Sequence, residues 1–383
     1  MNKVKLADVA IESRESLKTK DRTLPVVGLE HIIPEQINLT EWDVGVDNTF
    51  TKLFKKNDVL FGRRRAYLKK AAVAPCEGIC SGDITVIRAK EDKILPELLP
   101  FVIQNDIFFD YAVGKSAGSL SPRVKWEHLA KYEFILPSLS EQKKLAETLW
   151  SIVATMESYK KLLAKTDEMV KAKFVEMFGD AILNSKKIKT KKIGEFSDCI
   201  AGATPSTKIK EYWENGNIPW MSSGEVHNGR IYDTLEKITQ KGYDNCSTKL
   251  IRPHSVVIAL AGQGKTRGTV AVIENSVCTN QSLCAIVQNQ EILDTDFLYY
   301  QLKFRYQELR QLSGVAEGRG GLNLKNIQGI NALIPEMENQ ISFVNFAKKS
   351  EESKSAIQAS LDTLTQVYKK IIAENLGGNI NAN

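Results

Sequence analysis

The amino-acid sequence predicts an α/β (mixed α+β) protein in which two homologous halves carry two long antiparallel helices with pseudo-twofold symmetry. Three observations lead to this fold class. The chain has 383 residues, more than one hydrophobic core usually covers. The segment FILPSLSEQ at 134–142 recurs as ALIPEMENQ at 332–340, and an offset of 198 residues carries Pro137 onto Pro335. Each copy is followed by a long apolar stripe with helical spacing.

The repeat extends upstream of these segments with an offset that is one residue shorter. There NDVLF at 57–61 matches HSVVI at 254–258, and KAAVA at 70–74 matches RGTVA at 267–271. A period of about 200 residues is too long for a solenoid unit. It indicates two homologous halves, each with a globular part followed by a helix.

A long amphipathic helix is predicted in each half. The first follows alternating apolar steps of three and four up to Gly179, a typical helix stop, and Ser140 is its predicted N-cap. The second begins more polar, with Ser350 and Lys354 on its stripe, and ends at Gly377. A helix of about 39 residues extends about 58 Å. Two matched stripes favour packing of the helices against each other over packing of each on its own domain.

These helices set the predicted boundaries. The first domain is 1–139 and is followed by a first spacer helix at 140–179. The second domain is 180–337 and is followed by a second spacer helix at 338–377 and a tail at 378–383. Within the domains, short apolar and β-branched runs predict strands at 83–89, 255–261, 269–273 and 284–288. Longer apolar segments predict helices at 98–114 and 297–314.

Composition and charge exclude several classes of protein. No stretch approaches the roughly 18 apolar residues of a membrane span, and the first ten residues lack the apolar core of a signal peptide, so a cytoplasmic protein without a membrane partner is expected. Six cysteines without a CxxC pair argue against zinc and favour reduced thiols. The net charge of +6 leans mildly toward an acidic partner such as nucleic acid.

One motif points to nucleotide chemistry. Residues 259–266, ALAGQGKT, satisfy a loose phosphate-loop pattern. A phosphate loop needs a helix directly after it to hold the anion, whereas the strand-like RGTVAVI follows here. The four histidines form no nucleophile or metal constellation with nearby Cys or carboxylates. The sequence therefore predicts no catalytic residue and no metal, and an ATP-dependent enzyme using 259–266 is the alternative.

Basic residues gather at one aligned position of both halves. A Gly-rich loop with basic side chains lets the chain approach a DNA phosphate or base edge. A single loop of this kind is commonly only a solvated turn, but its coincidence in both halves favours DNA binding. The predicted DNA-binding residues are Arg63, Arg64, Arg65, Lys69 and Lys70 in the first half, and Gln263, Lys265, Thr266 and Arg267 in the second.

A family resemblance follows from the doubled arrangement. Each half closes on a Gly-rich turn, a strand, an LP or IP step, a Gln and a long helix, as in GSLSPRVKWEHLAKYEFILPSLSEQKKLAE at 118–147 and GRGGLNLKNIQGINALIPEMENQ at 318–340. Upstream, AVAPCEGICSGDITVI corresponds to VAVIENSVCTNQSLCAIV. Over essentially its whole length the chain resembles the specificity subunit of type I restriction-modification systems. One departure is Asn339, which stands where Glu141 precedes Gln142.

The resemblance implies a noncatalytic subunit whose two target recognition domains each read one half of a bipartite, asymmetric site in double-stranded DNA. The implied partners are two adenine-N6 methyltransferase subunits and restriction/translocase subunits. These would use S-adenosylmethionine, ATP and Mg, and this chain would hold no cofactor. The residues predicted to contact partner subunits are Leu145, Leu149, Ile152, Met156, Ile357, Leu361 and Leu364. Besides the ATP-dependent enzyme, a helical interaction scaffold is the remaining alternative.

Overall fold

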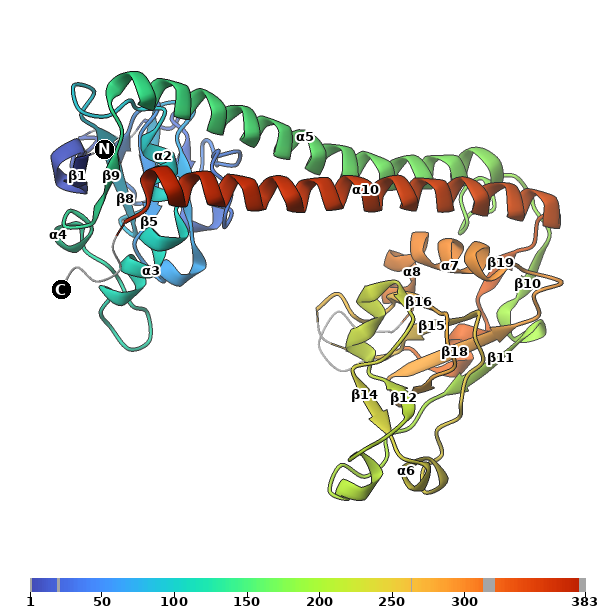
Figure 1. The fold of residues 1–383 in the computed structure, drawn as a ribbon. Helices are drawn as coiled ribbons and strands as arrows, with labels where there is room; N and C mark the ends of the chain where they lie inside the picture. Colours follow the sequence, from blue (N-terminus) through green and yellow to red (C-terminus); the bar gives the residue numbers. More distant parts are fainter. Residues whose placement is uncertain (1, 19–20, 263, 313–320, 379–383) are drawn as a thin grey trace. The chain divides into compact units, whose positions relative to one another are not determined.

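The computed structural model describes residues 2–18, 21–262, 264–312 and 321–378 (Figure 1). The chain divides into two compact units: unit 1 contains residues 1–162 and 357–383, and unit 2 contains residues 163–356. Two helices of 40 residues, α5 (Leu139–Phe178) and α10 (Met337–Leu376), each pass from one unit into the other. Each unit therefore combines a globular part with the first segment of one long helix and the last segment of the other.

Unit 1 is built on a four-stranded antiparallel sheet in the order β2-β8-β5-β6, with a three-stranded sheet β3-β7-β4 and the antiparallel pair β1-β9. Its strands are β1 (Asn2–Lys5), β2 (Ala10–Glu12), β3 (Val26–Val27), β4 (Lys52–Phe54), β5 (Val59–Gly62), β6 (Ala71–Val73), β7 (Gly78–Cys80), β8 (Ile84–Ala89) and β9 (Glu133–Leu136). Its shorter helices are α1 (Leu6–Val9), η1 (Leu29–His31), η2 (Ala66–Leu68), α2 (Leu99–Ile103), α3 (Asp106–Gly114) and α4 (Trp126–Leu129).

Unit 2 is built on a five-stranded sheet in the order β11-β18-β15-β16-β13, with a three-stranded sheet β14-β12-β17 and the antiparallel pair β10-β19. Its strands are β10 (Thr190–Lys192), β11 (Ser197–Ala201), β12 (Ile218–Met221), β13 (Arg230–Ile231), β14 (Glu236–Ile238), β15 (Ser255–Ala259), β16 (Val270–Ile273), β17 (Cys278–Thr279), β18 (Leu283–Gln288) and β19 (Asn331–Leu333). Its shorter helices are η3 (Ile193–Glu195), η4 (Lys210–Tyr212), η5 (Ser223–Asn228), α6 (Gln240–Asp244), α7 (Thr295–Phe304), α8 (Tyr306–Gln311) and α9 (Leu324–Gln328).

The two units repeat one strand order. In unit 2, β11-β18-β15-β16 repeats β2-β8-β5-β6, and β13 is an additional edge strand parallel to β16. The central strands β5 and β15 are buried at every position, which explains why they are read in the sequence as continuous apolar runs rather than alternating ones. The predicted mixed α/β class with two homologous halves and two long helices is thereby confirmed.

The strand register corrects one detail of the predicted repeat. Val59 pairs with Val73 and with Ile87, whereas its counterpart Val256 pairs with Val272 and with Ile286. Val73 therefore corresponds to Val272, and the match of KAAVA with RGTVA is wrong by two residues. Short runs of small apolar residues match in several registers, and only the cross-strand pairs decide between them. The connection that follows the central strand is two residues longer in unit 2.

Two predicted helices are each divided in the structure. The segment 98–114 forms α2 and α3, because buried Asn105 ends one helix and caps the next by accepting a hydrogen bond from the Ile107 N–H at 3.0 Å. The segment 297–314, whose last two residues lie outside the described residues, forms α7 and α8. Here the buried Arg305 separates the helices and donates to the Asn331 carbonyl at 2.6 Å.

The start of α5 differs from the predicted one. Ser138 rather than Ser140 is the N-cap: its N–H and hydroxyl both donate to the Glu141 carboxylate, at 2.9 and 2.7 Å. The prediction that Ser140 is the N-cap was wrong because the helix begins at Leu139, one residue before the predicted start. The second helix likewise begins one residue early, at Met337.

The repeated Gln is a buried clamp at the start of each long helix. The Gln142 amide donates to the Pro137 and Lys93 carbonyls at 3.1 and 3.3 Å, and its oxygen accepts from the Leu95 N–H at 3.0 Å. The Gln340 amide makes the same three bonds in unit 2, to the Pro335 and Ile292 carbonyls at 2.8 and 3.2 Å and from the Asp294 N–H at 2.8 Å. The repeated Pro and Gln thus join each helix to the loop that precedes α2 or α7.

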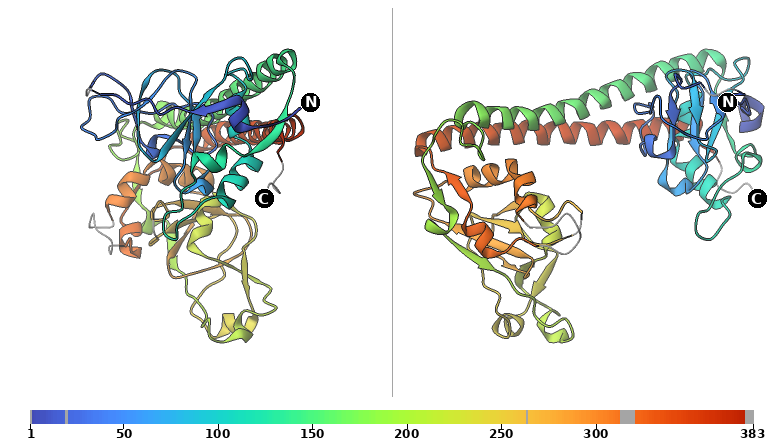
Figure 2. Two further views of the ribbon diagram at one scale, coloured as in Figure 1. Left: turned by 90° about the vertical axis from the view of Figure 1, so that its left-hand side faces the viewer. Right: turned by 180° about the vertical axis from the view of Figure 1, so that it is seen from behind.

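Within each unit the two helix segments lie side by side and cover one end of the globular part (Figures 1 and 2). Their buried residues belong to that unit's own core: Leu149, Val153 and Ile372 in unit 1, and Phe174 and Phe343 in unit 2. The predicted packing of the stripes against each other is also present: Phe174 of α5 and Phe343 of α10 have ring centroids 5.3 Å apart, and Lys354 of α10 pairs with Asp167 of α5 at 2.7 Å. Each stripe therefore contacts both the other helix and the domain. Near the helix ends, the large apolar surface of the adjacent domain decides which helix face is buried.

Candidate nucleic-acid interface

The predicted basic residues occupy the same place in both units. In unit 1 all five lie in the connection from β5 to β6, and in unit 2 Lys265, Thr266 and Arg267 lie in the connection from β15 to β16. Gln263 lies outside the described residues. The strand order thus brings each set together at one end of an equivalent hairpin, as the aligned sequence pattern predicted.

The two connections reach their tight turns by different means. In unit 1, Arg65 and Lys69 flank η2 in the left-handed region, with φ of 54° and 50°. Non-glycine residues adopt this conformation only where the surrounding structure imposes it. In unit 2 glycines supply the positive φ, including Gly264 at 59°. At its tight turns the first connection therefore carries the side chains of Arg65 and Lys69, whereas the second has a glycine without a side chain, Gly264.

Both lysines of the unit 1 connection are held by internal contacts. Lys69 forms an ion pair with Asp106 at 2.6 Å, and this carboxylate raises the pKa of Lys69 above its usual value. Lys70 donates to the Leu29 carbonyl at 2.5 Å. These contacts join the connection to α3 and to η1, so a structural role accounts for both lysines.

Arg64 holds a neighbouring loop. Its guanidinium donates to the Ser121 hydroxyl from two nitrogens, at 3.1 and 3.0 Å, and lies 3.5 Å from the Asp83 carboxylate. Asp83 also accepts from Arg123 at 2.8 Å, and the hydrogen bond from Arg123, aided by the charge of Arg64, holds the pKa of Asp83 below its usual range. The contacts place Arg64 beneath residues 117–123 rather than free in solvent.

The remaining two arginines are more accessible. Arg65 is exposed, while Arg63 is half-buried and its Nε is buried without a hydrogen-bond partner. Arg63 lines an open cavity of about 500 Å³ whose charged lining is mixed, with the cations Arg14, Lys52 and Lys125 and the carboxylates Glu12, Glu15 and Glu127. Arg65, Arg123 and Lys125 are exposed, and of these Arg123 is paired with Asp83. Arg65 and Lys125 are therefore the better candidates for contact with a DNA phosphate.

In unit 2 the equivalent connection is supported by α8. The Tyr306 hydroxyl donates to the Lys265 carbonyl at 2.9 Å, and Arg310 donates to the Gly264 carbonyl at 2.7 Å. The Thr266 hydroxyl lies 3.1 Å from Nε2 of His227. The Lys265 side chain is exposed and Arg267 is half-buried. Lys265 is therefore the counterpart of Arg65 in accessibility.

The predicted set did not include the segment that lies against each basic connection. The Val124 N–H donates to the Arg63 carbonyl at 3.0 Å, and the Leu322 N–H donates to the Leu260 carbonyl at 2.9 Å in the same position of unit 2. The repeated Gly-rich turns, GSLSPR and GRGGLN, were the available signal for this segment. Within it the structure describes residues 117–123 and 321–322.

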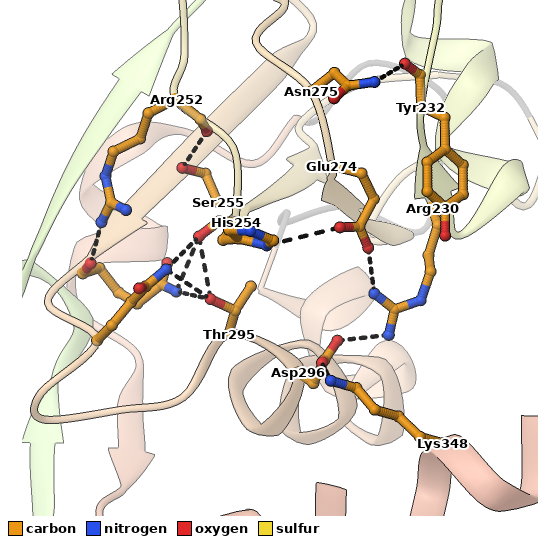
Figure 3. A network of polar contacts seen from close by, with 12 residues as sticks. Arg230, Tyr232, Arg252, His254, Ser255, Glu274, Asn275, Thr295, Asp296 and Lys348 are labelled. Carbon is orange, nitrogen blue, oxygen red and sulfur yellow. Dashed lines mark hydrogen bonds and ion pairs between the residues drawn. The ribbon is translucent and has the colours of Figure 1, made fainter. Parts of the chain in front are cut away.

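A second polar site lies between the sheet of unit 2 and α10 (Figure 3). A groove of about 930 Å³ is lined by residues of β13, β16, α7 and α10. Asp296, almost fully buried, accepts from Arg230 at 2.5 Å and from Lys348 at 2.8 Å, and Arg230 also pairs with Glu274. Burial alone would raise the pKa of Asp296, but Lys348 and Arg230 outweigh it and hold it below its usual range. The opposite charges neutralise one another, so the network is structural rather than anion-binding.

The phosphate-loop alternative is not supported by the geometry. Residues 259–266 lead into β16, which pairs antiparallel with β15 in a hairpin, and no helix begins at Thr266 to offer its N-terminal amides to a phosphate. Among the described residues, no group of three or more His, Cys, Asp or Glu side chains could hold a metal. No helix in the described part of the chain is long and apolar enough to cross a membrane.

The residues predicted to contact partner subunits divide into two groups. Leu149 and Leu361 are buried within the chain, and Leu145 packs against the core of unit 1. Ile152, Met156, Ile357 and Leu364 are half-buried. A buried side chain cannot form part of a free docking surface, so Leu149 and Leu361 are corrected to structural residues. The exposed large apolar residues of α5 are instead Leu139, Leu162, Met169 and Val175.

Comparisons with known proteins place the chain. The family model for the type I restriction modification DNA specificity domain matches residues 1–166 and 185–366. The chain is 24% identical over 225 residues to the EcoR124I/EcoR124II specificity subunit of Escherichia coli, covering 57% of this chain and 55% of that protein. It is 20% identical over 383 residues to the putative type I restriction enzyme MjaX specificity subunit of Methanocaldococcus jannaschii, covering 93% and 87%. The chain thus spans about half the length of the E. coli relative.

Solved structures share the fold. The S subunit of a type I restriction-modification system from M. genitalium superposes with a TM-score of 0.60 at 12% identity, covering 98% of this chain and 96% of that one. A chain from a study of the assembly and conformational transition of the type I R-M system superposes with a TM-score of 0.57 at 20% identity, covering 98% and 97%. Because the family model matches most of the sequence, in two copies that follow the two halves, this chain belongs to the type I restriction-modification DNA specificity family.

Proposed function

We propose that this chain is the noncatalytic DNA-specificity subunit of a type I restriction-modification complex, in which each unit reads one half of a bipartite, asymmetric site in double-stranded DNA. The observation that carries the proposal is the equivalent placement of two basic hairpin connections in two homologous units, with Arg65 and Lys265 exposed. Two readers on one chain match a site with two halves. Different side chains in the two connections match an asymmetric site.

The proposed mechanism separates positioning from reading. Contacts from Arg65, Lys125 and Lys265 to phosphates fix the register of the duplex, because phosphate contacts carry no sequence information of their own. Sequence is read by side chains that reach base edges from the loops beside these cations. The internal bonds of Arg64, Lys69 and Lys70 hold the loops in place before DNA arrives.

The chemistry of such a complex belongs, in this proposal, to other subunits. Two adenine-N6 methyltransferase subunits and restriction/translocase subunits would bind S-adenosylmethionine, ATP and Mg, and this chain would hold no cofactor. Docking on the long helices is supported by Leu162 and Met169, which lie seven residues apart on one face of α5 and are each 47% exposed.

A domain exchange tests the proposal. The chain is co-expressed with its methyltransferase, residues 1–138 are replaced by the matching segment of a related subunit, and methylated adenines in the host genome are sequenced. One half of the methylated motif should change while the other half and complex assembly stay as they were. The reciprocal exchange of 193–336 is the matched control and should change only the other half. A change of both halves in either variant contradicts the assignment of one half-site to each unit.

A further inference from the structure

The loop 117–123 of unit 1 is held rigidly at both sides. On one side the Arg65 N–H donates to the Pro122 carbonyl at 2.8 Å, and Arg64 binds the Ser121 hydroxyl. On the other side Ala117 and Arg123 exchange backbone hydrogen bonds of 3.0 and 2.9 Å, and Arg123 pairs with Asp83. The two ends of the loop are therefore anchored to the basic connection and to each other, with residues 118–120 between them at the tip.

An aliphatic side chain forms the tip of this loop. Leu120 is 90% exposed, and its neighbours Gly118 and Ser119 are small and exposed as well. Gly118 adopts a φ of +116°, a conformation that few other residues tolerate, and it turns the chain just before the tip. Because Leu120 is almost fully exposed, burial in the core of unit 1 does not explain an apolar residue at this position.

The surroundings of Leu120 match DNA rather than a protein core. The loop is flanked by the exposed cations Arg65, Arg123 and Lys125, and the carboxylate beneath it, Asp83, is neutralised by two arginines. Cations around an apolar tip suit a groove whose walls are phosphates and whose floor carries base edges. In the major groove the thymine C5 methyl is the apolar group that base pairs present.

We propose that Leu120 reads a thymine in the half-site of unit 1 through the C5 methyl, and that Arg64 and Asp83 are positioning residues for this contact. The inference rests on the proposed DNA-specificity function. It adds the residue that specifies one base and the chemical group on which it acts. Burying one methyl group changes affinity about fourfold.

The test replaces thymine by uracil, which lacks only the methyl group. The full chain in complex with its methyltransferase is titrated with duplexes carrying the methylated motif, and each thymine of the half-site is replaced in turn. With the wild-type chain, one replacement should weaken binding about fourfold. With Leu120→Ala the unmodified duplex should bind more weakly by a similar factor, and the same replacement should have no further effect. Leu235→Ala, which alters a leucine that is 89% exposed in unit 2, is the matched control and should retain the response to that replacement.

The positioning role is tested separately. Arg64→Ala should weaken binding and reduce the response to uracil, because loop 117–123 loses the two hydrogen bonds to the Ser121 hydroxyl. Arg65→Ala should lower the salt dependence and keep the response to uracil. If Leu120→Ala binds and responds like the wild type, or weakens binding while the response to uracil persists, the thymine assignment is wrong. Weaker assembly with the methyltransferase at unchanged DNA affinity would instead make Leu120 a protein contact.

Failure of this inference is distinguishable from failure of the proposed function. If the wild-type complex binds no duplex selectively and methylates no motif, the proposed function itself fails. If the wild-type complex reads a bipartite motif and no uracil replacement weakens binding, the proposed function stands and only the role of Leu120 is overturned.

Discussion

The two units join their domain to the long helices by contrasting chemistry at equivalent positions. In unit 1, Trp150 of α5 donates to the Glu97 carbonyl at 2.9 Å and packs edge-on against Phe101, with ring centroids 5.0 Å apart. Tyr368 of α10 also packs edge-on against Phe101, with centroids 6.1 Å apart. In unit 2, Lys348 takes the place of Trp150 and pairs with Asp296 at 2.8 Å beside an open groove. Where unit 1 fills the space with aromatic rings, unit 2 spans it with an ion-pair network.

The contrast shows which features the fold requires. The Gln clamp at the helix start is the same in both units, because it satisfies buried backbone groups that both units share. The contact further along each helix can be apolar, as between Trp150 and Phe101, or charged, as between Lys348 and Asp296, because both partners differ together between the units. The charged version makes this contact of unit 2 dependent on pH and salt, whereas the aromatic contact at the same position of unit 1 is not. Unit 1 has its own helix ion pair elsewhere, between Lys369 of α10 and Asp106 at 3.0 Å.

The largest effect is expected from a leucine that only unit 1 possesses. Leu149 is fully buried, and the corresponding residue of unit 2 is the equally buried Ala347. Leu149→Ala leaves a cavity and should destabilise unit 1 by about 3 kcal/mol without affecting unit 2. The measurement is native-state hydrogen exchange, which reports the stability of each unit separately. A single unfolding curve would not do so, because the two units can unfold in separate transitions. Leu162→Ala on the same helix, at an exposed position, should change protection by less than about 0.5 kcal/mol.

The clamps should behave alike. Gln142→Ala and Gln340→Ala each leave buried backbone groups without partners, and each should lower the stability of its own unit by about 2 kcal/mol. Hydrogen exchange of the amides near Leu95 and Asp294 provides the measurement. Gln366→Ala, at an exposed position of α10, is the control. A large effect in one unit and none in the other would show that the repeated Gln is required for only one of the helices.

The ion-pair network should make unit 2 sensitive to acid. The pKa of Asp296 is lowered in the folded state, so its contribution is present above the unfolded value of about 3.9 and is lost as pH falls through the lower folded value. Exchange of the α7 amides should therefore accelerate below about pH 4. Asp296→Asn should lower stability at neutral pH by about 1 kcal/mol and flatten this acid response. An unchanged response in the variant would assign it to other carboxylates.

The smallest effects distinguish DNA contacts from internal ones. Arg65→Ala and Lys265→Ala each remove an exposed cation, and each should reduce the slope of log affinity against log salt by about 0.9. Lys70→Ala, which removes a cation already bonded to the Leu29 carbonyl, should leave that slope unchanged. Single variants are needed because a triple alanine variant of Arg63, Arg64 and Arg65 would also release the loop that Arg64 holds.

The sequence by itself determined the features that depend on periodicity and repetition. A stripe with steps of three and four specifies a helix whatever surrounds it, and the recurrence of Pro137 and Gln142 at Pro335 and Gln340 revealed two halves before any contact was known. Strand runs were equally visible because the central strands are buried on both faces. The same alignment placed basic residues in one equivalent connection of both units.

Only the tertiary structure decided what each of those residues contacts. Arg64, Arg65 and Lys69 are similar in sequence terms, yet Arg64 holds Ser121, Lys69 pairs with Asp106, and Arg65 alone of the three remains exposed. These partners lie 37 or more residues away, so no local pattern can reveal them. The burial of Leu149 had the same origin, since an amphipathic stripe identifies an apolar face but not the surface that covers it. Leu120 gave no periodic signal at all, and its exposure beside the arginines emerged only when the chain folded.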